Sequence, residues 1–302
     1  MPIHALKVSH ENRHKRLDVF LKENLSDVPS RAFVQKLIEN GHVRVNEIIA
    51  KAHHKLKEGE EVLVDVVEDF FAPQYIAPEN IPLDIFYEDS FLLVINKPVG
   101  MTVHPASGCY TGTLVNALLH YSKELSDVND AMRPGIVHRL DKETSGLMLV
   151  AKDNITHTKL AKQFERREIK KKYIALVEGD VLCDEGKVDV PIGRNPFHHE
   201  KKAVSYEDSA KQAITFYQVL KRDHAVTMIA LFPQTGRTHQ LRVHMKHLGH
   251  PILGDDKYGH KNKFPRLALH AQSISFFHPR TKDFLEFSSA IPIEFVKEMQ
   301  GV

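Results

Sequence analysis

Many short apolar runs separated by turn residues constrain the fold of this chain more than any other feature. They recur from residue 81 onward, and few segments between them have helical spacing. We expect helices at 114–121 with Thr113 as N-cap, after Asn154 as N-cap, and near 238–248. Strands are expected at 84–87, 91–95, 147–151, 173–178, 203–206, 212–219 and 225–231. Such a pattern predicts an α+β fold with a mixed, mostly antiparallel β-sheet and flanking helices.

Residues 13–66 form a separate small α/β pattern. A helix near 17–25 precedes a second helix with Ser30 as a candidate N-cap and Gly41 as its stop. Two alternating valines, an Asn46-Glu47 turn and the run 61–64 then predict strands.

The segment between the two patterns is predicted to be a linker. Residues 67–80 contain two prolines and no Lys or Arg, which favours an extended, acidic chain. The expected organisation is therefore a domain at 13–66, a linker at 67–80 and a larger domain at 81–302.

Composition excludes several classes of protein. The only cysteines, Cys109 and Cys183, offer no disulfide framework, so nothing indicates an oxidising compartment. The N-terminal residues lack the apolar core of a secretory signal, and no apolar run approaches the roughly 20 residues of a membrane helix. We expect a soluble, cytoplasmic protein. No GxGxxG or GxxxxGK[ST] motif is present, and we expect no nucleotide cofactor.

The string HRLDKETSG, residues 138–146, places an acid between cations. Asp141 lies between Arg139 and Lys142, in a loop that we expect to join two strands, at 136–137 and 147–151. The neighbouring positive charges favour the ionised carboxylate. Thr144 and Ser145 are expected to hydrogen-bond the loop backbone, and Gly146 to let the chain turn into the strand. Alone, this pattern also fits an ordinary solvated Asp.

A basic stretch follows. Residues 152–172 contain eight Lys or Arg and three Asp or Glu, a density that favours phosphate contact. It ends at Lys170-Lys171-Lys172, directly before Tyr173.

The segment 236–255 allows a second kind of site. His244 and His247, three residues apart on a predicted helix, could bind a metal ion together with Asp255. However, cations are interleaved with them and would repel a dication, so we expect RNA contact here and no metal.

Together these strings resemble the RluA/RluD-type RNA pseudouridine synthases, often preceded by an S4 RNA-binding domain. The resemblance implies that Asp141 is the nucleophile and that Arg139 takes the place of the flipped-out uridine. It implies that Tyr173 stacks on the uracil, and that Arg242 orients Asp141 through a bidentate pair. Lys97 and His104, in the NKP and VHP strings, would support the cleft or contact RNA.

Further RNA-binding residues follow from the same resemblance. In the S4-like domain they are Arg31, Lys36 and Arg44. In the larger domain, the density of the basic stretch adds Lys171 and Lys172 as RNA-binding residues, and Arg237 is expected to be structural or to bind phosphate. The family is monomeric by default and requires no cofactor or metal. The sequence departs from the family pattern at two places: Lys202 stands where Met is usual, and the region between 258 and 269 is short. Both departures would alter which RNA site is chosen.

The implied activity is conversion of uridine to pseudouridine in structured RNA, most readily large-subunit ribosomal RNA. Asp141 would attack uracil C6 or ribose C1′, or assist an elimination; the sequence leaves these routes open. The alternative is a non-catalytic S4-type RNA-binding or ribosome-assembly protein.

Overall fold

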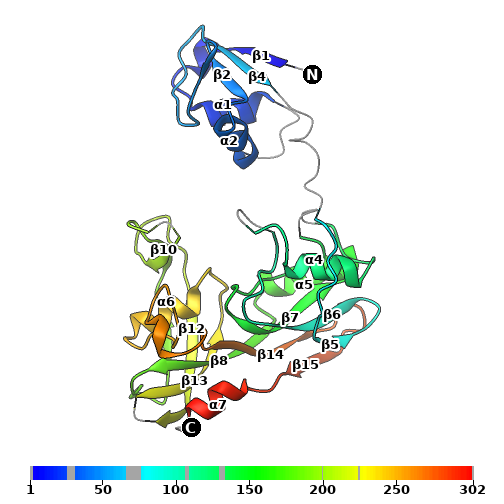
Figure 1. The fold of residues 1–302 in the computed structure, drawn as a ribbon, viewed down its shortest axis with the longest axis vertical. Coiled ribbons are helices and arrows are strands. Elements are labelled where there is room, and N and C mark those ends of the chain that lie inside the picture. Colours follow the sequence, from blue (N-terminus) through cyan, green and yellow to red (C-terminus); the bar gives the residue numbers. More distant parts are fainter. Residues whose placement is uncertain are drawn as a thin grey trace. The chain divides into compact units, whose positions relative to one another are not determined.

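The chain divides into two compact units, residues 1–75 and 76–302. The computed structural model describes residues 3–25, 31–65, 76–105, 109–128, 133–198, 200–223 and 225–300 (Figure 1). Ser30 and most of the predicted linker 67–80 lie outside the described residues. No helix among the described residues has both the length and the apolar character needed to cross a membrane.

The first unit is a four-stranded antiparallel sheet packed against two helices. Its strand order is β1-β4-β2-β3, and its core is formed by the apolar sides of both helices and of the sheet. The strand β1 was not predicted. The elements are β1 (Ile3–Lys7), η1 (His10–Asn12), α1 (Leu17–Asn24), α2 (Arg31–Glu39), β2 (Val43–Val45), β3 (Ile48–Ile49) and β4 (Glu61–Asp65).

Both predicted turns of this unit are confirmed. Gly41 has a φ of +79°, its N–H donates to Ile38 O, and the next N–H donates to Leu37 O, which ends α2 in a Schellman motif. Asn46 and Glu47 both have positive φ, as the tight turn between β2 and β3 requires.

A nine-stranded sheet is the centre of the second unit. Its order is β5-β6-β7-β14-β8-β13-β12-β9, with β15 also paired to β14, and only the β7–β14 pair is parallel. The predicted mixed, mostly antiparallel α+β fold is therefore confirmed. The strands are β5 (Ile85–Glu88), β6 (Leu92–Lys97), β7 (Ser145–Ala151), β8 (Lys170–Glu178), β9 (Glu185–Asp189), β12 (Ile214–Asp223), β13 (Val226–Pro233), β14 (Leu269–Phe277) and β15 (Phe284–Ser288); β10 (Ile192–Arg194) and β11 (Lys202–Val204) form a separate hairpin.

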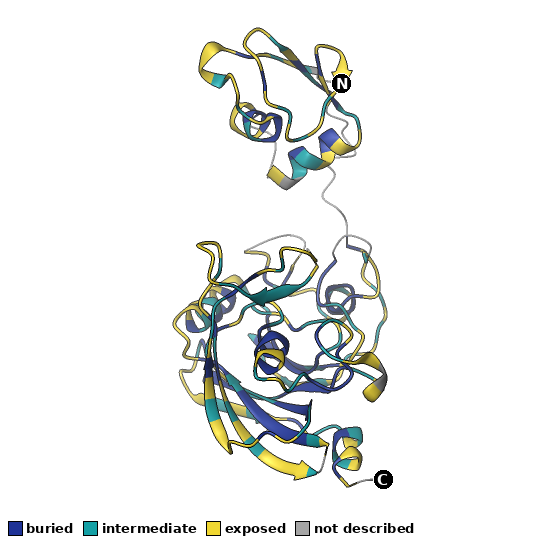
Figure 2. Cartoon of the chain, turned by 90° about the vertical axis from the view of Figure 1, so that its left-hand side faces the viewer, coloured by how far each residue is buried: buried dark blue, intermediate teal, exposed yellow. Residues whose placement is uncertain are grey.

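Helices pack on both faces of this sheet. On β6, Leu93 and Ile95 belong to the core around α4 (Leu114–Tyr121), while Leu92 and Val94 belong to the core around α5 (Asn154–Glu165). The alternation of side chains along a strand thus buries both faces of β6. α6 (Gln240–His247) and α7 (Ile293–Glu298) pack on the second half of the sheet, and the short η2 spans Lys261–Lys263. Figure 2 shows the buried residues concentrated on the central strands.

Two local predictions in this unit were wrong, and one was confirmed. Thr113 caps α4 as expected. Asp153, and not Asn154, caps α5, because its carboxylate accepts the N–H groups of Ile155 and Thr156. The Asp141 loop does not join two strands, since the run before it forms only one isolated bridge, between Ile136 and Val150.

Candidate active site

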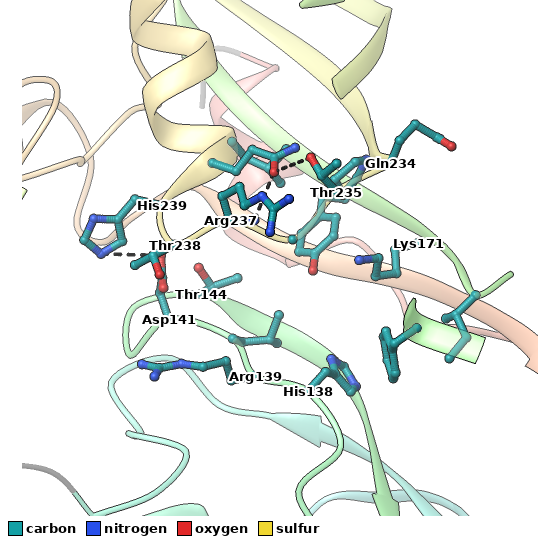
Figure 3. A pocket seen from close by; sticks show the side chains of 18 of the residues that line it. His138, Arg139, Asp141, Thr144, Lys171, Gln234, Thr235, Arg237, Thr238 and His239 are labelled. Carbon is teal, nitrogen blue, oxygen red and sulfur yellow. Dashed lines mark hydrogen bonds and ion pairs between the residues drawn. The ribbon is translucent and has the colours of Figure 1, made fainter. Parts of the chain in front are cut away.

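A cavity of about 770 Å³ lies between the Asp141 loop, the start of β8 and the segment that leads from β13 into α6 (Figure 3). Its wall brings together residues from three distant parts of the sequence. The polar and aromatic side chains in this wall include those of Arg139, Asp141, Thr144, Lys171, Tyr173, Arg237, His239 and Arg242.

The Asp141 loop is a tight turn fastened to a neighbouring loop. The N–H of Thr144 donates to Asp141 O at 3.1 Å, which closes the turn. The N–H of Gly100 donates to Lys142 O at 2.9 Å. Asp141 itself keeps 23% of its side-chain surface exposed, so its carboxylate is accessible from the cavity.

Lys97 provides the second attachment of this loop. Its ammonium group is buried and donates to the carbonyl oxygens of Pro98, Met101 and Lys142, at 2.8, 2.9 and 3.1 Å. Burial lowers the pKa of Lys97 to about 8, although the charges of Glu143 and Asp141 oppose that shift. Of the two sequence interpretations of Lys97, support of the cleft fits this geometry.

Gly146 sets the position of the strand that follows the loop. Its φ is +116°, and a Cβ built on it would lie 2.3 Å from Ala271 O on the parallel neighbour β14. Ser145 does not bond the loop backbone as predicted. Its hydroxyl is 2.9 Å from His270 Nδ1 and accepts from Arg266 at 3.1 Å, because it faces into the sheet.

Arg242 was expected to form a bidentate pair with Asp141, and that expectation was wrong. Its Nε and Nη2 donate to the two oxygens of buried Asp255, at 2.7 and 2.6 Å, and Nη2 also donates to Asp256 at 3.1 Å. Only Nη1 reaches Asp141, 3.8 Å from Oδ2. Burial disfavours the charge on Asp255, but the hydrogen bond and charge of Arg242 outweigh it and lower the pKa of Asp255.

His239 is the second titratable side chain close to Asp141. Its Nε2 lies 3.9 Å from Asp141 Oδ2, and Figure 3 shows the two side chains facing each other. Its Nδ1 lies 2.8 Å from the hydroxyl of Tyr258. Burial lowers the pKa of His239, and the charge of Asp141 only partly opposes this, so the neutral ring is favoured.

Strand β8 contributes an aromatic ring and a cation. Tyr173 lines the cavity, and burial together with the charge of Asp141 raises its pKa, which keeps the phenol protonated. Lys171, two residues earlier on the same face, also lines the cavity, and its Nζ lies 5.8 Å from the centre of the Phe164 ring. Lys172 is not part of the lining and alternates to the other face.

Two predicted arginines lie in the cavity wall. Arg139 is exposed beside Asp141 (Figure 3). Arg237 is half-buried, and its Nε donates to Gln212 O at 3.1 Å, which leaves the rest of the guanidinium facing the cavity region.

The predicted RNA-binding residues of the first unit are all exposed. Arg31 lies at the start of α2, but its guanidinium donates to the buried Asp18 at 2.8 and 3.0 Å. Lys36 is on the exposed side of α2, and Arg44 is on the exposed side of β2. Arg31 thus has a structural ion pair in addition to any contact with RNA.

The residues considered for a metal site lie in different surroundings. His244 is buried, with Nδ1 2.9 Å from Thr215 Oγ1, whereas His247 is exposed and Asp255 pairs with Arg242. Within the described ranges, no three His, Cys, Asp or Glu side chains gather as they would around a metal ion.

Sequence reasoning missed three residues of this site. His239 was visible within the string 236–244, but nothing in the sequence placed its ring beside Asp141. Asp255 had been considered only as a metal ligand, and Tyr258 only as the start of a short region. Asp255 and Tyr258 lie three residues apart in one loop after a predicted helix, and this spacing is the only feature of the sequence that links the two residues.

Comparison with known proteins identifies the family. Residues 91–247 match the sequence profile of the RNA pseudouridylate synthases, and residues 15–62 match the S4 domain. The chain is 41% identical over 299 residues to the uncharacterized RNA pseudouridine synthase YlyB of Bacillus subtilis, covering 98% of this chain and 97% of that protein. It is 38% identical over 305 residues to ribosomal large subunit pseudouridine synthase D of Zymomonas mobilis, covering 97% and 95%.

A solved structure agrees. Human RNA pseudouridylate synthase domain containing 1 superposes with a TM-score of 0.60 at 26% identity, covering 73% of this chain and 87% of that one. The chain belongs to the RNA pseudouridine synthase family, and it is an isomerase that converts uridine in RNA to pseudouridine. These comparisons give no support to the non-catalytic alternative.

Proposed function

We propose that Asp141 is the nucleophile of this isomerisation. The observation that carries the proposal is the position of Asp141 Oδ2, 3.8 Å from Arg242 and 3.9 Å from His239, on a cavity wall that Tyr173 shares. A partly exposed carboxylate that lies near two nitrogen groups, without a short hydrogen bond to either, is free to react with a base in the cavity.

The reaction exchanges one glycosidic bond for another. The N1–C1′ bond breaks, the uracil rotates while it is held, and C5 bonds to C1′; the proton leaves C5 and N1 gains one. Asp141 acts by attack on uracil C6, by attack on ribose C1′, or by assisting elimination. All three routes place the carboxylate beside the reacting sugar and base, and none consumes a redox equivalent.

Tyr173 and Arg139 are proposed to stabilise the flipped-out uridine and the RNA stack that it leaves. A uridine within a helix must leave its stack to enter the cavity, at a cost of about a few kcal/mol. The exposed guanidinium of Arg139 is planar and can fill the vacated position in the stack. The Tyr173 ring would then stack on the uracil inside the cavity, a contact worth about 1–3 kcal/mol.

RNA backbone contacts are assigned to both units, residues 1–75 and 76–302. Within the catalytic domain, Lys171 and Arg237 in the cavity wall and Lys172 on the opposite side of β8 are proposed to bind phosphates. Arg31, Lys36 and Arg44 are proposed for the S4-like domain. Their exposure and charge support this assignment.

The proposed substrate is large-subunit ribosomal RNA. Support comes from relatives such as ribosomal large subunit pseudouridine synthase D of Pseudomonas aeruginosa, 37% identical over 97% of this chain. We further propose that the enzyme acts in the cytoplasm, where ribosomal RNA is found in bacteria, and that it acts as a monomer. Mapping pseudouridines in ribosomal RNA from cells with and without the gene identifies the target; an unchanged map would contradict the substrate proposal.

Release of tritium from C5 tests the role of Asp141. A ribosomal RNA transcript tritiated at uracil C5 should lose label to water with the wild-type chain. Asp141→Asn should release none while binding the transcript with similar affinity, and the exposed carboxylate variant Asp84→Asn should behave as wild type. Release by Asp141→Asn at the wild-type rate would remove Asp141 from the chemistry.

A second variant separates the two roles of Tyr173. Tyr173→Phe keeps the ring and should keep RNA affinity within about twofold, because stacking does not depend on the hydroxyl. Slower tritium release in this variant would assign proton transfer to the hydroxyl, and unchanged turnover would restrict Tyr173 to stacking.

A further inference from the structure

Tyr258 connects the two nitrogen groups beside Asp141. It is 6% exposed and lies in the loop after α6. The centre of its ring lies 5.1 Å from Arg242 Cζ, and its N–H donates at 2.9 Å to Asp255, the anchor of that arginine. Its hydroxyl lies 2.8 Å from His239 Nδ1. One side chain thus contacts both residues that flank the carboxylate.

The hydroxyl of Tyr258 is placed to select which nitrogen of His239 carries the proton. The phenolic oxygen accepts the backbone N–H of Lys202 at 2.7 Å, and its own hydrogen is free to be donated to Nδ1 of the imidazole. A neutral imidazole that accepts at Nδ1 is protonated at Nε2. That N–H faces Asp141 Oδ2.

The backbone at His239 is held in an unusual conformation. Its φ of 57° and ψ of 18° are left-handed, a conformation that few residues other than glycine adopt, although Asn, Asp and His do so more often than the rest. The segment is fixed by buried Gln240, which accepts from the Thr235 hydroxyl and the Arg237 N–H and donates to Ile214 O. Such strain persists only where surrounding contacts over-determine the conformation, commonly at functional sites.

We propose that Tyr258 is a positioning residue for the isomerisation, which directs His239 Nε2–H and Arg242 Nη1 toward the same oxygen of Asp141. The inference rests on the proposed role of Asp141. The 3.9 Å separation would shorten to a hydrogen bond when RNA fills the cavity, as catalytic contacts often do. Because Lys202 begins β11, the same hydroxyl ties this arrangement to the β10–β11 hairpin.

The charges around His239 are consistent with an orienting role. Asp141 and Asp255 favour the protonated ring, while Arg242 and Lys257 disfavour it, and burial exceeds each of them. The imidazole is therefore a neutral donor whose direction is set by its hydrogen bond with Tyr258.

Kinetics of Tyr258→Phe provide the first test. The variant keeps the ring on Arg242 and removes only the hydroxyl. Loss of the hydrogen bond that orients His239 should lower kcat about three- to tenfold, with KM within about twofold, and the Lys202 N–H loses its acceptor in the same variant. Tyr121→Phe is the matched control, because it removes from α4 a half-exposed hydroxyl that donates to Glu88 of β5. Equal kcat in Tyr258→Phe and wild type would overturn the proposal.

Two replacements of His239 separate orientation from backbone strain. Gln places an N–H near the position of Nε2, whereas Asn places one near Nδ1 but tolerates the left-handed backbone better. The proposal expects His239→Gln to retain more kcat than His239→Asn. The opposite order would show that residue 239 matters only for the turn.

Nitrogen NMR of the full chain, labelled on its histidine rings, gives a readout without turnover. His239→Gln assigns the His239 signals among the twenty histidines. Wild type should show the Nε2–H tautomer, and Tyr258→Phe should show a mixture; an Nδ1–H tautomer in wild type would overturn the proposal. Because the tautomer is measured without substrate, it is independent of whether Asp141→Asn loses activity.

Discussion

Arg242 forms its bidentate ion pair with Asp255, at 2.6 and 2.7 Å, and approaches Asp141 only through Nη1, at 3.8 Å. Asp255 holds the guanidinium in place, and Asp141 lies farther from it. The carboxylate proposed for chemistry is thus the less tightly held of the two. A tightly paired Asp141 would have to break two short hydrogen bonds before it could attack.

We expect Asp255→Asn to destabilise the catalytic unit by about 3 kcal/mol, because it leaves a buried guanidinium without its partner. Asp256→Asn, which removes a half-exposed partner of the same arginine, should cost less than about 1 kcal/mol. All tyrosines except Tyr75 lie in residues 76–302, so tyrosine fluorescence during urea unfolding measures this unit. Equal losses in both variants would contradict the anchoring role of Asp255.

Acid should destabilise the catalytic unit below pH 6.5. Burial lowers the pKa of both His244 and His270 to about 4, whereas an unfolded histidine titrates near about 6.5. As pH falls between these values, the unfolded chain binds protons that the folded chain does not. Each histidine should therefore lower the unfolding free energy by up to about 1.4 kcal/mol per pH unit.

The matching variants are His270→Asn and, at an exposed position, His198→Asn. The first should flatten the dependence of unfolding free energy on pH, measured by urea unfolding at several pH values, and the second should leave it as in wild type. If the unfolding free energy of His270→Asn depended on pH as in wild type, the buried, neutral His270 would not be a source of the instability in acid.

Gly146→Ala should destabilise the fold by about 3 kcal/mol or more. The new Cβ would meet Ala271 O at 2.3 Å, in a backbone conformation that alanine disfavours. Gly249→Ala is the control, because φ is +86° there but no atom lies within 4 Å of the added Cβ, so only about 1 kcal/mol of strain is expected. Similar unfolding free energies for the two variants would contradict the close β7–β14 approach as the cause.

Salt should weaken RNA binding steeply, and Arg237 should contribute to that dependence. Replacing a phosphate-binding arginine lowers the slope of log affinity against log salt by about one. We expect this of Arg237→Gln in filter binding of a ribosomal RNA transcript. Lys187→Gln, on the edge strand β9 and outside the cavity lining, should keep the wild-type slope. An unchanged slope in Arg237→Gln would remove it from the RNA contacts.

Much of the fold could be predicted from apolar periodicity, and the exceptions have physical causes. The central strand β14 was missed because buried polar residues interrupt its pattern. His270 is one of them, and it hydrogen-bonds Ser145 and Ser289 within the core. The short edge strand β9 was missed because only Val188 among its residues is buried.

The site was predictable in its residues but not in all of its pairings. The strings around Asp141, Tyr173 and Arg242 indicated which side chains meet, and the structure brings all three to one cavity. The bidentate partner of Arg242 could not be predicted from the sequence. Asp141, Asp255 and Asp256 all lie near its guanidinium, and the conformation of the loop after α6 decides which of them forms the short hydrogen bonds.

The three carbonyls held by Lys97 have a consequence for how substrate and enzyme meet. A loop fastened through Lys142 and through the turn at Thr144 is preorganised, so it has little freedom to follow an incoming base. On binding, the conformational change then occurs mainly in the RNA. The target nucleotide has to move into the cavity, while the loop that carries Asp141 keeps its conformation. Sites where the RNA is already open or weakly stacked would be modified fastest, and selection among uridines would begin with local RNA stability.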